Sequence, residues 1–330
     1  MKILGIETSC DETSAAVVEN GRRVLSNIIA SQVDLHSPFG GVVPEIAARR
    51  HIECIRFIVD EALAKANVSL AGIDAYAVAN GPGLAGALLV GLNYAKGLSF
   101  VHKKPLVGVH HIEGHVCANF LTEIELHPPF LSLVVSGGHT LLLAVEDYDT
   151  YRIVGSTRDD AAGEAFDKIA RVLGLPYPGG PEIDKISQGV APTIHFPRAR
   201  VSGFDFSFSG LKTAVMQYIK KQEQINTADI AASFQDAVVS ALAANTIAAA
   251  KAENLETIAL AGGVACNSAL RKKMRELCEQ NNLKIHVPPP IFCTDNAAMI
   301  ASRGYFALRS GKRDELSLNA FPGRMVGTRI

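Results

Sequence analysis

The sequence has no tryptophan, no CxxC cysteine pair and no apolar run of the eighteen or so residues that a membrane span requires. Its six cysteines are scattered, which is typical of free thiols in a reducing compartment and excludes a dense disulfide framework. Neither sign of charge dominates, because 32 Lys and Arg accompany 33 Asp and Glu. The overall charge therefore does not favour adhesion to nucleic acid or membrane, and any RNA contact would come from a local basic patch.

The remaining composition predicts a globular, cytoplasmic protein. Hydrophobic residues make up 48% of the 330 positions and charged residues 20%, which excludes a disordered or low-complexity chain. The start, MKILGIETSCDET, turns acidic after a short apolar run and resembles neither a signal peptide nor an Arg-rich transit peptide. We expect no membrane contact, and the length favours about two domains.

Strand-like segments alternate with glycine turns and helical segments, a pattern typical of α/β proteins. Residues 2–31 predict a β-meander with an Asn-Gly turn, and residues 44–66 predict a long helix that begins at a proline. Residues 130–156 predict a second meander, which is followed by helical stretches up to about residue 251. We therefore expect two α/β lobes with a cleft between them.

The segment GVHHIEGH contains the first candidate site. If a helix begins near His110, then His111 and His115 lie four residues apart on one face, about 5–6 Å apart at Cβ, which suits two imidazoles on one metal ion. Two half-buried histidines without a metal are the alternative, and His110 is a candidate cap or support residue. A zinc peptidase of the HExxH type would need a glutamate after His111, but Ile112 stands there, so that reaction loses its base.

Asp295, in the segment CTDNAAM, is the candidate third ligand. It follows Thr294 at an expected helix start, where its carboxylate could instead cap the helix. Two histidines and one carboxylate with open positions suit iron(II), and zinc or manganese are chemically admissible.

Glycine turns form a second group of candidates. The segments VVSGGHT, LAGGVACN and ANGPGLAG place glycines where strands end, so that backbone N–H groups can approach a phosphate. None of them matches a P-loop or a dinucleotide-binding fingerprint.

Acidic residues form a third group. Asp11 and Glu12 stand on the first turn, which we expect to be short, polar and outside the core. Asp159 and Asp160 precede a helical segment and are expected to stabilise its N-terminus. Asp167 lies further along that segment among apolar residues, where a carboxylate needs a partner such as a ribose hydroxyl.

Ten segments, in order from about residue 3 to residue 320, resemble the TsaD family. They are GIETSCDET, GGVVPEIAARRH, GPGLAGALLVG, HHIEGH, VSGGHT, DDAAGEAFDK, YPGGP, FSFSGLKTAV, AGGVACN and CTDNAAM. The resemblance implies an actin-like, Hsp70-like ATPase fold of two duplicated lobes with the active site in the interlobe cleft. The N-terminal lobe would comprise residues 1–107, with a C-terminal tail from about 303 to 330 packing back on it, and the second lobe residues 108–302.

The activity that this resemblance implies is that of a tRNA N6-adenosine threonylcarbamoyltransferase. The threonylcarbamoyl group would pass from threonylcarbamoyl-AMP to N6 of the adenosine 3′ of the anticodon, in tRNAs that read codons beginning with A. The partners would be tRNA, a TsaB-like paralogue and a TsaE-like ATPase, with a TsaC-type synthase supplying threonylcarbamoyl-AMP.

The resemblance also assigns site residues. His111, His115 and Asp295 would bind one iron(II) ion per chain, with zinc as the alternative. The adenine nucleotide would be threonylcarbamoyl-AMP, ATP or ADP, with or without a magnesium ion. Nine residues would bind it, the first five on the phosphate side and the others on the ribose and base side: Val134, Val135, Ser136, Gly137, Gly138, Asp167, Gly180, Asp184 and Asn267. Asp11 or Glu12 is our candidate for the catalytic base or for orienting the substrate.

Three alternative functions differ in what they require of the sequence. A sugar or acetate kinase of the same superfamily would use similar glycine turns, but it would need no histidine-bound metal. A metallopeptidase, the older description of the family, lacks its base, as noted above. A non-catalytic scaffold protein could lose HHIEGH and CTDNAAM without penalty, and both segments are present.

Overall fold

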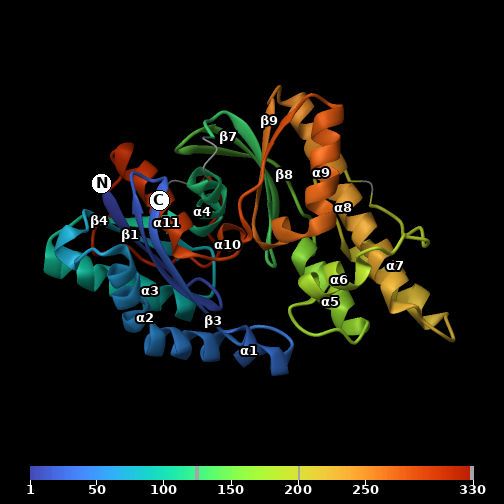
Figure 1. Cartoon of the computed structure of the whole chain (residues 1–330), viewed down its shortest axis with the longest axis horizontal. Helices are drawn as coiled ribbons and strands as arrows, with labels where there is room; N and C mark the ends of the chain where they lie inside the picture. The colour runs from blue at the N-terminus through green and yellow to red at the C-terminus, as the bar shows by residue number, and fades with distance from the viewer. Residues whose placement is uncertain (123–125, 200, 328–330) are drawn as a thin grey trace. The chain divides into compact units, whose positions relative to one another are not determined.

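The computed structural model describes residues 1–122, 126–199 and 201–327, which form two compact units (Figure 1). Unit 1 contains Met1–Pro128, Glu146–Tyr151 and Pro288–Ile330, and unit 2 contains Pro129–Val145 and Arg152–Val287. These boundaries differ from the expected ones, because residues 108–122, 126–128 and 288–302 belong to unit 1. The difference arises because β5 (Leu106–His110) continues directly into α4 (His111–Cys117), and α11 (Ala297–Arg309) packs on the strands of unit 1.

The sheet of unit 1 begins with the expected meander. Within the described residues its strand order is β3-β2-β1-β4-β5. β1 (Lys2–Glu7), β2 (Glu12–Glu19) and β3 (Arg23–Ser31) are antiparallel, and the β2–β3 turn has positive φ at Asn20 and Gly21, as an Asn-Gly turn requires. β4 (Ala75–Gly81) pairs parallel with β1, and β5 pairs parallel with β4.

Alternating side chains of β1 supply two cores, one on each face of this sheet. Leu4 and Ile6 pack in the core that contains buried residues of α2 (Pro44–Ala66) and α3 (Ala85–His102), whereas Ile3 packs in the core that contains α11. The shorter helices of unit 1 are α1 (Val33–His36), η1 (Ser37–Phe39), η2 (Leu70–Gly72), η3 (Ala118–Leu121) and α10 (Pro290–Cys293).

The segment after α11 returns to the sheet of unit 1. The backbone N–H of Asp314 donates to the carbonyl of Leu106 at 2.9 Å, and that of Phe321 donates to the carbonyl of Asn80 at 2.7 Å. These bonds hold the described part of the tail along β4 and β5.

Unit 2 repeats the strand arrangement of unit 1. Its sheet has the order β10-β9-β6-β7-β8, with β6 (Phe130–Val135), β7 (Thr140–Asp147) and β8 (Thr150–Ser156) as the meander and β9 (Thr257–Ala261) and β10 (Lys284–His286) as the parallel strands. In each unit the first meander strand is central and the two later strands extend the sheet beside it. The expected duplication is thus confirmed at the level of topology.

The helices of unit 2 occupy the connections between these strands. They are α5 (Ala162–Val172), α6 (Gly179–Ser187), α7 (Ser209–Lys220), α8 (Thr227–Ala252), η4 (Gly263–Cys266) and α9 (Ser268–Gln280). Among the described residues, α8 is the helix whose length and mean hydropathy of 1.2 would suffice for a membrane span. Because 78% of that apolar window is buried inside the protein, α8 has the character of a core helix.

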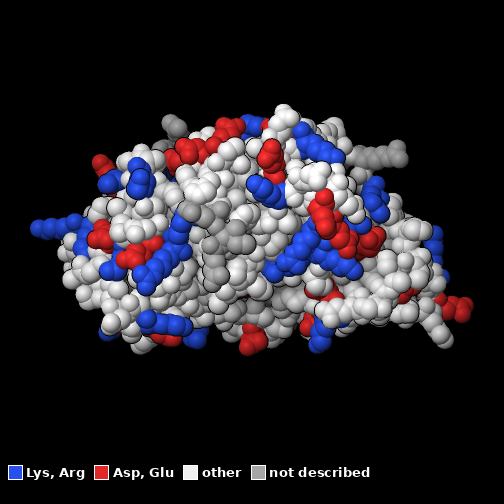
Figure 2. Space-filling view, turned by 45° about the horizontal axis from the view of Figure 1, so that its top comes forward, with Lys and Arg blue, Asp and Glu red and all other residues white. Residues whose placement is uncertain are grey.

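Charged side chains of both signs are intermixed on the surface. Figure 2 shows Lys and Arg beside Asp and Glu in several clusters, with uncharged surface between them. This agrees with the formal net charge of −1.

Candidate functional site

Helix α4 presents two histidines on one face, as their spacing predicted. The imidazole Nδ1 of His110 accepts the backbone N–H of Ile112 at 3.2 Å, so His110 is the N-cap. His111 and His115 are 7% and 0% exposed, and their ring centroids lie 4.7 Å apart. The expected helix start and the capping role of His110 are both confirmed.

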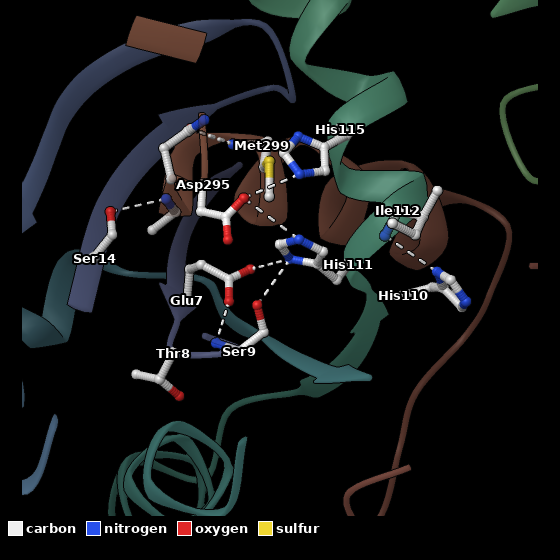
Figure 3. A network of polar contacts seen from close by, with 12 residues as sticks. Glu7, Thr8, Ser9, Ser14, His110, His111, Ile112, His115, Asp295 and Met299 are labelled. Carbon is white, nitrogen blue, oxygen red and sulfur yellow. Dashed lines mark hydrogen bonds and ion pairs between the residues drawn. The ribbon is translucent and has the colours of Figure 1, made fainter. Parts of the chain in front are cut away.

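Asp295 faces these two imidazoles (Figure 3). Its Oδ1 lies 3.5 Å from Nε2 of His111 and 3.1 Å from Nε2 of His115. The N-cap of α11 is Asn296, whose side chain accepts the N–H of Met299 at 3.0 Å. Asp295 is therefore not the cap, and its carboxylate is available to the histidines.

The donor set fits a divalent metal ion. The ligand atoms of His111, His115 and Asp295 all lie within 4.8 Å of one another. Neither ring nitrogen of His115 makes a hydrogen bond with the described residues, although both are buried. Because buried polar atoms nearly always have partners, this imidazole fits a metal ligand better than a core residue. Two imidazoles and one carboxylate suit iron, zinc or manganese.

Mutual attraction dominates the electrostatics of this group. Burial disfavours the charged imidazole of His111, but the carboxylates of Asp295 and Glu7 outweigh it and hold its pKa well above the usual value. Burial likewise opposes ionisation of Asp295, yet His111 and His115 hold its pKa far below the usual range. Without metal, His111 and Asp295 thus stabilise each other's charged forms.

Two residues that the sequence analysis missed contact His111. Glu7 ends β1 with 0% exposure, and its Oε2 lies 2.9 Å from Nδ1 of His111 (Figure 3). Ser9 Oγ lies 3.1 Å from the same nitrogen, and the N–H of Ser9 donates to Oε1 of Glu7 at 2.5 Å. A charged residue at the end of the apolar run KILGIE was the signal that could have identified Glu7.

Asp11 and Glu12 lie deeper than expected. Asp11 is only 8% exposed, so the expectation of an exposed turn outside the core is wrong for this residue. Glu12 is the first residue of β2 and accepts a hydrogen bond from the hydroxyl of Ser31 at 3.2 Å. Burial, followed by the charges of Asp295 and Asp11, raises the pKa of Glu12 well above its usual value. Glu12 therefore lies within the electrostatic reach of Asp295.

Glu113, the glutamate of HHIEGH, does not join the histidines. Its Oε2 accepts Nε of Arg303 at 2.7 Å, and both side chains are almost fully buried. A second nitrogen of Arg303 pairs with Asp149. This arrangement anchors α4 to α11 and directs the carboxylate of Glu113 to Arg303.

In unit 2, the turn after β6 leaves backbone accessible. Val134 and Val135 are buried in β6, and the N–H of Ser136 donates to the carbonyl of His139 at 2.8 Å. A Cβ atom built on Gly137 or Gly138 would meet no atom within 4 Å. The two glycines therefore border open space, in which a ligand could approach their N–H groups.

The four other residues assigned to the nucleotide are linked through α6. Asp167 of α5 accepts the N–H of Gly179 at 2.8 Å, next to Gly180, and burial raises its pKa despite this bond. Asp184 of α6 accepts both the N–H and the hydroxyl of Ser268, at 3.0 and 2.7 Å.

Asn267 precedes Ser268 and is the N-cap of α9. Its Oδ1 accepts the N–H of Leu270 at 2.9 Å, and its amide donates to Gln235 at 2.7 Å. The four residues thus lie around the N-termini of α6 and α9, whose positive ends favour an anionic ligand.

Asp159 stabilises a different helix from the one expected. It accepts the N–H groups of Phe208 and Ser209 at the start of α7, at 2.8 and 3.4 Å. Asp160 pairs with Lys168 of α5 at 3.0 Å and with Lys212 of α7 at 2.6 Å. The expectation that Asp159 acts on the N-terminus of α5 was wrong, because the chain brings α7 back beside the segment that precedes α5.

The sequence of this chain matches one protein family along most of its length. Residues 23–302 match the family model described as TsaD, tRNA N6-adenosine threonylcarbamoyltransferase. A Clostridium botulinum protein named tRNA N6-adenosine threonylcarbamoyltransferase is 56% identical over 336 residues, which cover 100% of this chain and 99% of that protein. A Clostridium perfringens protein of the same name is 57% identical, covering 99% of this chain and 98% of that protein.

Solved structures support the fold alone. HypF of T. kodakarensis matches 94% of this chain and 48% of its own with a TM-score of 0.67 at 15% identity. Component A of (R)-2-hydroxyglutaryl-CoA dehydratase from Acidaminococcus fermentans matches 94% of this chain and 100% of its own with a TM-score of 0.56, also at 15% identity. The expected actin-like ATPase fold is thereby confirmed.

Proposed function

Because the chain belongs to the TsaD family of tRNA N6-adenosine threonylcarbamoyltransferases, we propose that its two residue clusters serve one acyl transfer, with a metal ion in unit 1 and an adenine nucleotide in unit 2. The convergence of His111, His115 and Asp295 on one point carries the proposal for unit 1. The open backbone at Gly137 and Gly138 carries the proposal for unit 2.

The enzyme transfers the threonylcarbamoyl group from threonylcarbamoyl-AMP to N6 of the adenosine 3′ of the anticodon, in tRNAs that read codons beginning with A. A bond forms between N6 and the carbamoyl carbon, and the bond from that carbon to the phosphate oxygen breaks. AMP leaves as an anion, and N6 loses a proton. The protein therefore has to position a weak nucleophile, accept a proton and stabilise negative charge.

We assign the metal ligands to Nε2 of His111, Nε2 of His115 and a carboxylate oxygen of Asp295, and we propose iron(II) as the ion, with zinc as the alternative. When bound, such an ion would supply Lewis acidity toward the carbamoyl oxygen of the donor.

Asp11 and Glu12 are proposed to act on the amine. Asp11 is buried, and Glu12 stands at the start of β2 with a single hydroxyl donor at hand. A carboxylate held close to other carboxylates is a better proton acceptor than a solvated one. One of the two would accept the N6 proton or orient the amine as a hydrogen-bond acceptor.

The residues Val134 to Gly138 are proposed to hold the phosphate of the donor, because the glycine N–H groups can approach an anion there. Asp167, Gly180, Asp184 and Asn267 would hold the ribose and base near the N-termini of α6 and α9. ATP or ADP would bind in the same way, with or without a magnesium ion.

Metal removal tests the proposal for unit 1. We expect protein treated with a strong chelator to lose transfer of labelled threonylcarbamoyl to tRNA, and iron(II) or zinc to restore it. Undiminished transfer by protein shown by elemental analysis to be metal-free would contradict the assignment.

Gly137→Val tests the proposal for unit 2. The space beside Gly137 is open, so the new side chain should leave the fold intact and occupy the phosphate position. We expect calorimetric affinity for ADP to fall by more than tenfold, or about 1.4 kcal/mol, with an unchanged melting temperature. Equal ADP affinities of the wild type and Gly137→Val would contradict a phosphate site at Gly137.

tRNA is the acceptor substrate, and we propose three protein partners: a TsaB-like paralogue, a TsaE-like ATPase and a TsaC-type synthase that supplies the donor. α2 leaves Ile52 and Phe57 exposed by 65% and 69%, and exposed large apolar side chains on one helix suit a protein contact such as that with the paralogue. We propose that the complex is cytoplasmic, where tRNA is found.

The family match does not support the kinase, peptidase or scaffold alternatives.

A further inference from the structure

We propose that Glu7 is a positioning residue of the metal centre, which fixes the imidazole of His111 so that Nε2 is free to bind the metal. The inference rests on the metal-binding role proposed above. It concerns the contact at the opposite side of the ring, where Oε2 of Glu7 lies 2.9 Å from Nδ1 of His111.

The chemistry of the contact determines which nitrogen carries hydrogen. An ionised carboxylate can only accept, so Nδ1 of His111 is the donor and carries the hydrogen. In the neutral ring Nε2 then has the free electron pair, and Nε2 is the nitrogen that faces Asp295 at 3.5 Å. A carboxylate behind a histidine ligand fixes both the tautomer and the ring orientation in this way.

The other carboxylate oxygen of Glu7 also has a hydrogen-bond partner, which fixes the orientation of the side chain. Its Oε1 accepts the N–H of Ser9 at 2.5 Å, and the whole side chain is buried with 0% exposure. Burial of a carboxylate without hydrogen-bond partners is costly, and each oxygen of Glu7 has a partner. The backbone of the turn after β1 thus sets the plane of the carboxylate, and the carboxylate sets the plane of the ring.

His115 provides the contrast within the same centre. Its Nδ1 is buried without a hydrogen-bond partner among the described residues. Apart from the contact of Nε2 with Asp295, packing orients His115, whereas Nδ1 of His111 faces the carboxylate of Glu7. The loss of Glu7 should then disturb one ligand selectively and leave the other in place.

Glu7→Gln is the diagnostic substitution, because glutamine has the same shape but only one accepting oxygen. Both neighbours of Glu7 are donors, so the glutamine amide must turn its NH₂ group toward Ser9 or toward His111. The first orientation leaves a backbone donor unpaired, and the second favours hydrogen on Nε2 and blocks the metal. We expect zinc affinity, measured by competition with a chromophoric chelator, to fall by about tenfold to a hundredfold.

Glu113→Gln is the matched control. Glu113 is also a buried carboxylate in unit 1, and it lies on the same helix as the two histidines, but it pairs with Arg303 and not with His111. We expect this variant to keep zinc affinity within about threefold of the wild type. Wild-type protein that binds no zinc would overturn both the metal centre and this inference. Tight zinc binding by the wild type and by Glu7→Gln alike would overturn this inference only.

A measurement on the wild type covers the case in which Glu7→Gln fails to fold. In zinc-loaded protein with ¹⁵N-labelled histidine, we expect NMR to show His111 with hydrogen on Nδ1 and zinc on Nε2. Hydrogen on Nε2, or a Nδ1–H that exchanges as fast as that of an exposed histidine, would refute the contact with Glu7.

Discussion

His115 is the residue whose environment most directly indicates a bound ion. Its imidazole is fully buried, it faces Asp295, and its nitrogens make no hydrogen bond with the described residues. A structural histidine in a core normally donates at least one hydrogen bond. We therefore expect His115→Ala to lower the metal content to less than a tenth of the wild-type value and to abolish transfer.

The exposed His195 supplies a control for the loss of any histidine. His195→Ala should retain full metal content and transfer. Elemental analysis after dialysis against a weak chelator measures both variants, and full occupancy in His115→Ala would remove this residue from the centre.

Asp11 and Glu12 allow binding and chemistry to be separated. Asp11→Asn and Glu12→Gln keep the size of each side chain while removing the proton acceptor. If one of them is the base, single-turnover transfer should fall by about a hundredfold or more, the range expected for general base catalysis. ADP affinity should stay near that of the wild type, because the proposed nucleotide residues all belong to unit 2.

Melting curves are needed beside these rates, since Asp11 is only 8% exposed and its substitution can affect stability as well. Full activity in both single variants and in the double variant would exclude the pair from the mechanism.

At the scale of elements, the N-terminus of α5 supports the turn after β6 through a close backbone approach. A Cβ on Gly163 would lie 2.6 Å from the carbonyl oxygen of Ser136 and 2.8 Å from Cα of Gly137. We expect Gly163→Ala to displace this turn, to weaken ADP binding by at least tenfold and to destabilise the protein by about 1–3 kcal/mol, as overpacking does.

Gly210 is the matched control, because it is also the second residue of its helix, α7, and a Cβ there would meet nothing within 4 Å. Gly210→Ala should leave ADP affinity unchanged and stabilise the protein by up to about 1 kcal/mol, through the higher helix propensity of alanine. Equal ADP affinities for the two variants would show that the approach at Gly163 does not shape the site.

α2 holds the turn before β2 through a buried histidine. His51 has 0% exposure, its Nε2 lies 2.9 Å from the carbonyl oxygen of Cys10, and its Nδ1 lies 2.8 Å from the hydroxyl of Thr13. A carbonyl only accepts, so Nε2 carries hydrogen and Nδ1 accepts from Thr13. Burial is the main reason why the pKa of His51 lies below its usual value.

The lowered pKa of His51 makes the free energy of unfolding depend on pH. The unfolded chain protonates His51 near its ordinary pKa of about 6.5, whereas the folded protein resists protonation to lower pH. The stabilising contribution is complete above about pH 6.5 and is lost as the pH falls toward the folded value.

Urea unfolding of metal-free protein between pH 7.5 and 5.5 measures this effect. The free energy of unfolding should fall less steeply with decreasing pH in His51→Gln, which cannot titrate, than in the wild type. Identical slopes would show that His51 titrates alike in both states.

At the scale of the whole molecule, the two units should respond to different ligands. The metal residues all belong to unit 1, and the proposed nucleotide residues all belong to unit 2. A ligand that binds only the folded state stabilises it, by about 2.7 kcal/mol at a concentration a hundred times its Kd. Zinc should therefore slow hydrogen exchange first in α4 and at the start of α11, and ADP first around residues 134–138 and 179–184.

Hydrogen exchange with mass spectrometry distinguishes these patterns. His115→Ala should lose the zinc response and keep the ADP response, and Gly137→Val should do the reverse. If zinc protected only the segments of unit 2, the assignment of the sites to units would be wrong.

Local patterns were sufficient for much of this protein. The apolar period and the Asn-Gly turn predicted the strands of the first meander, and the proline at a helix start predicted α2. Both predictions succeeded because each of these signals depends only on neighbours in the sequence. The spacing of four between His111 and His115 likewise determined that both lie on one face of a helix. The ordered motifs added the family and its fold.

Contacts between distant segments were decided only by the tertiary structure. Asp295 is 180 residues from His115 in the chain, and only the packing of α11 beside α4 brings them to 3.1 Å. The partner of Glu7, the helix capped by Asp159 and the burial of Asp11 depend in the same way on segments that the sequence separates. Local periodicity carries no information on such pairs, because it records which face a residue occupies and not which other face it meets.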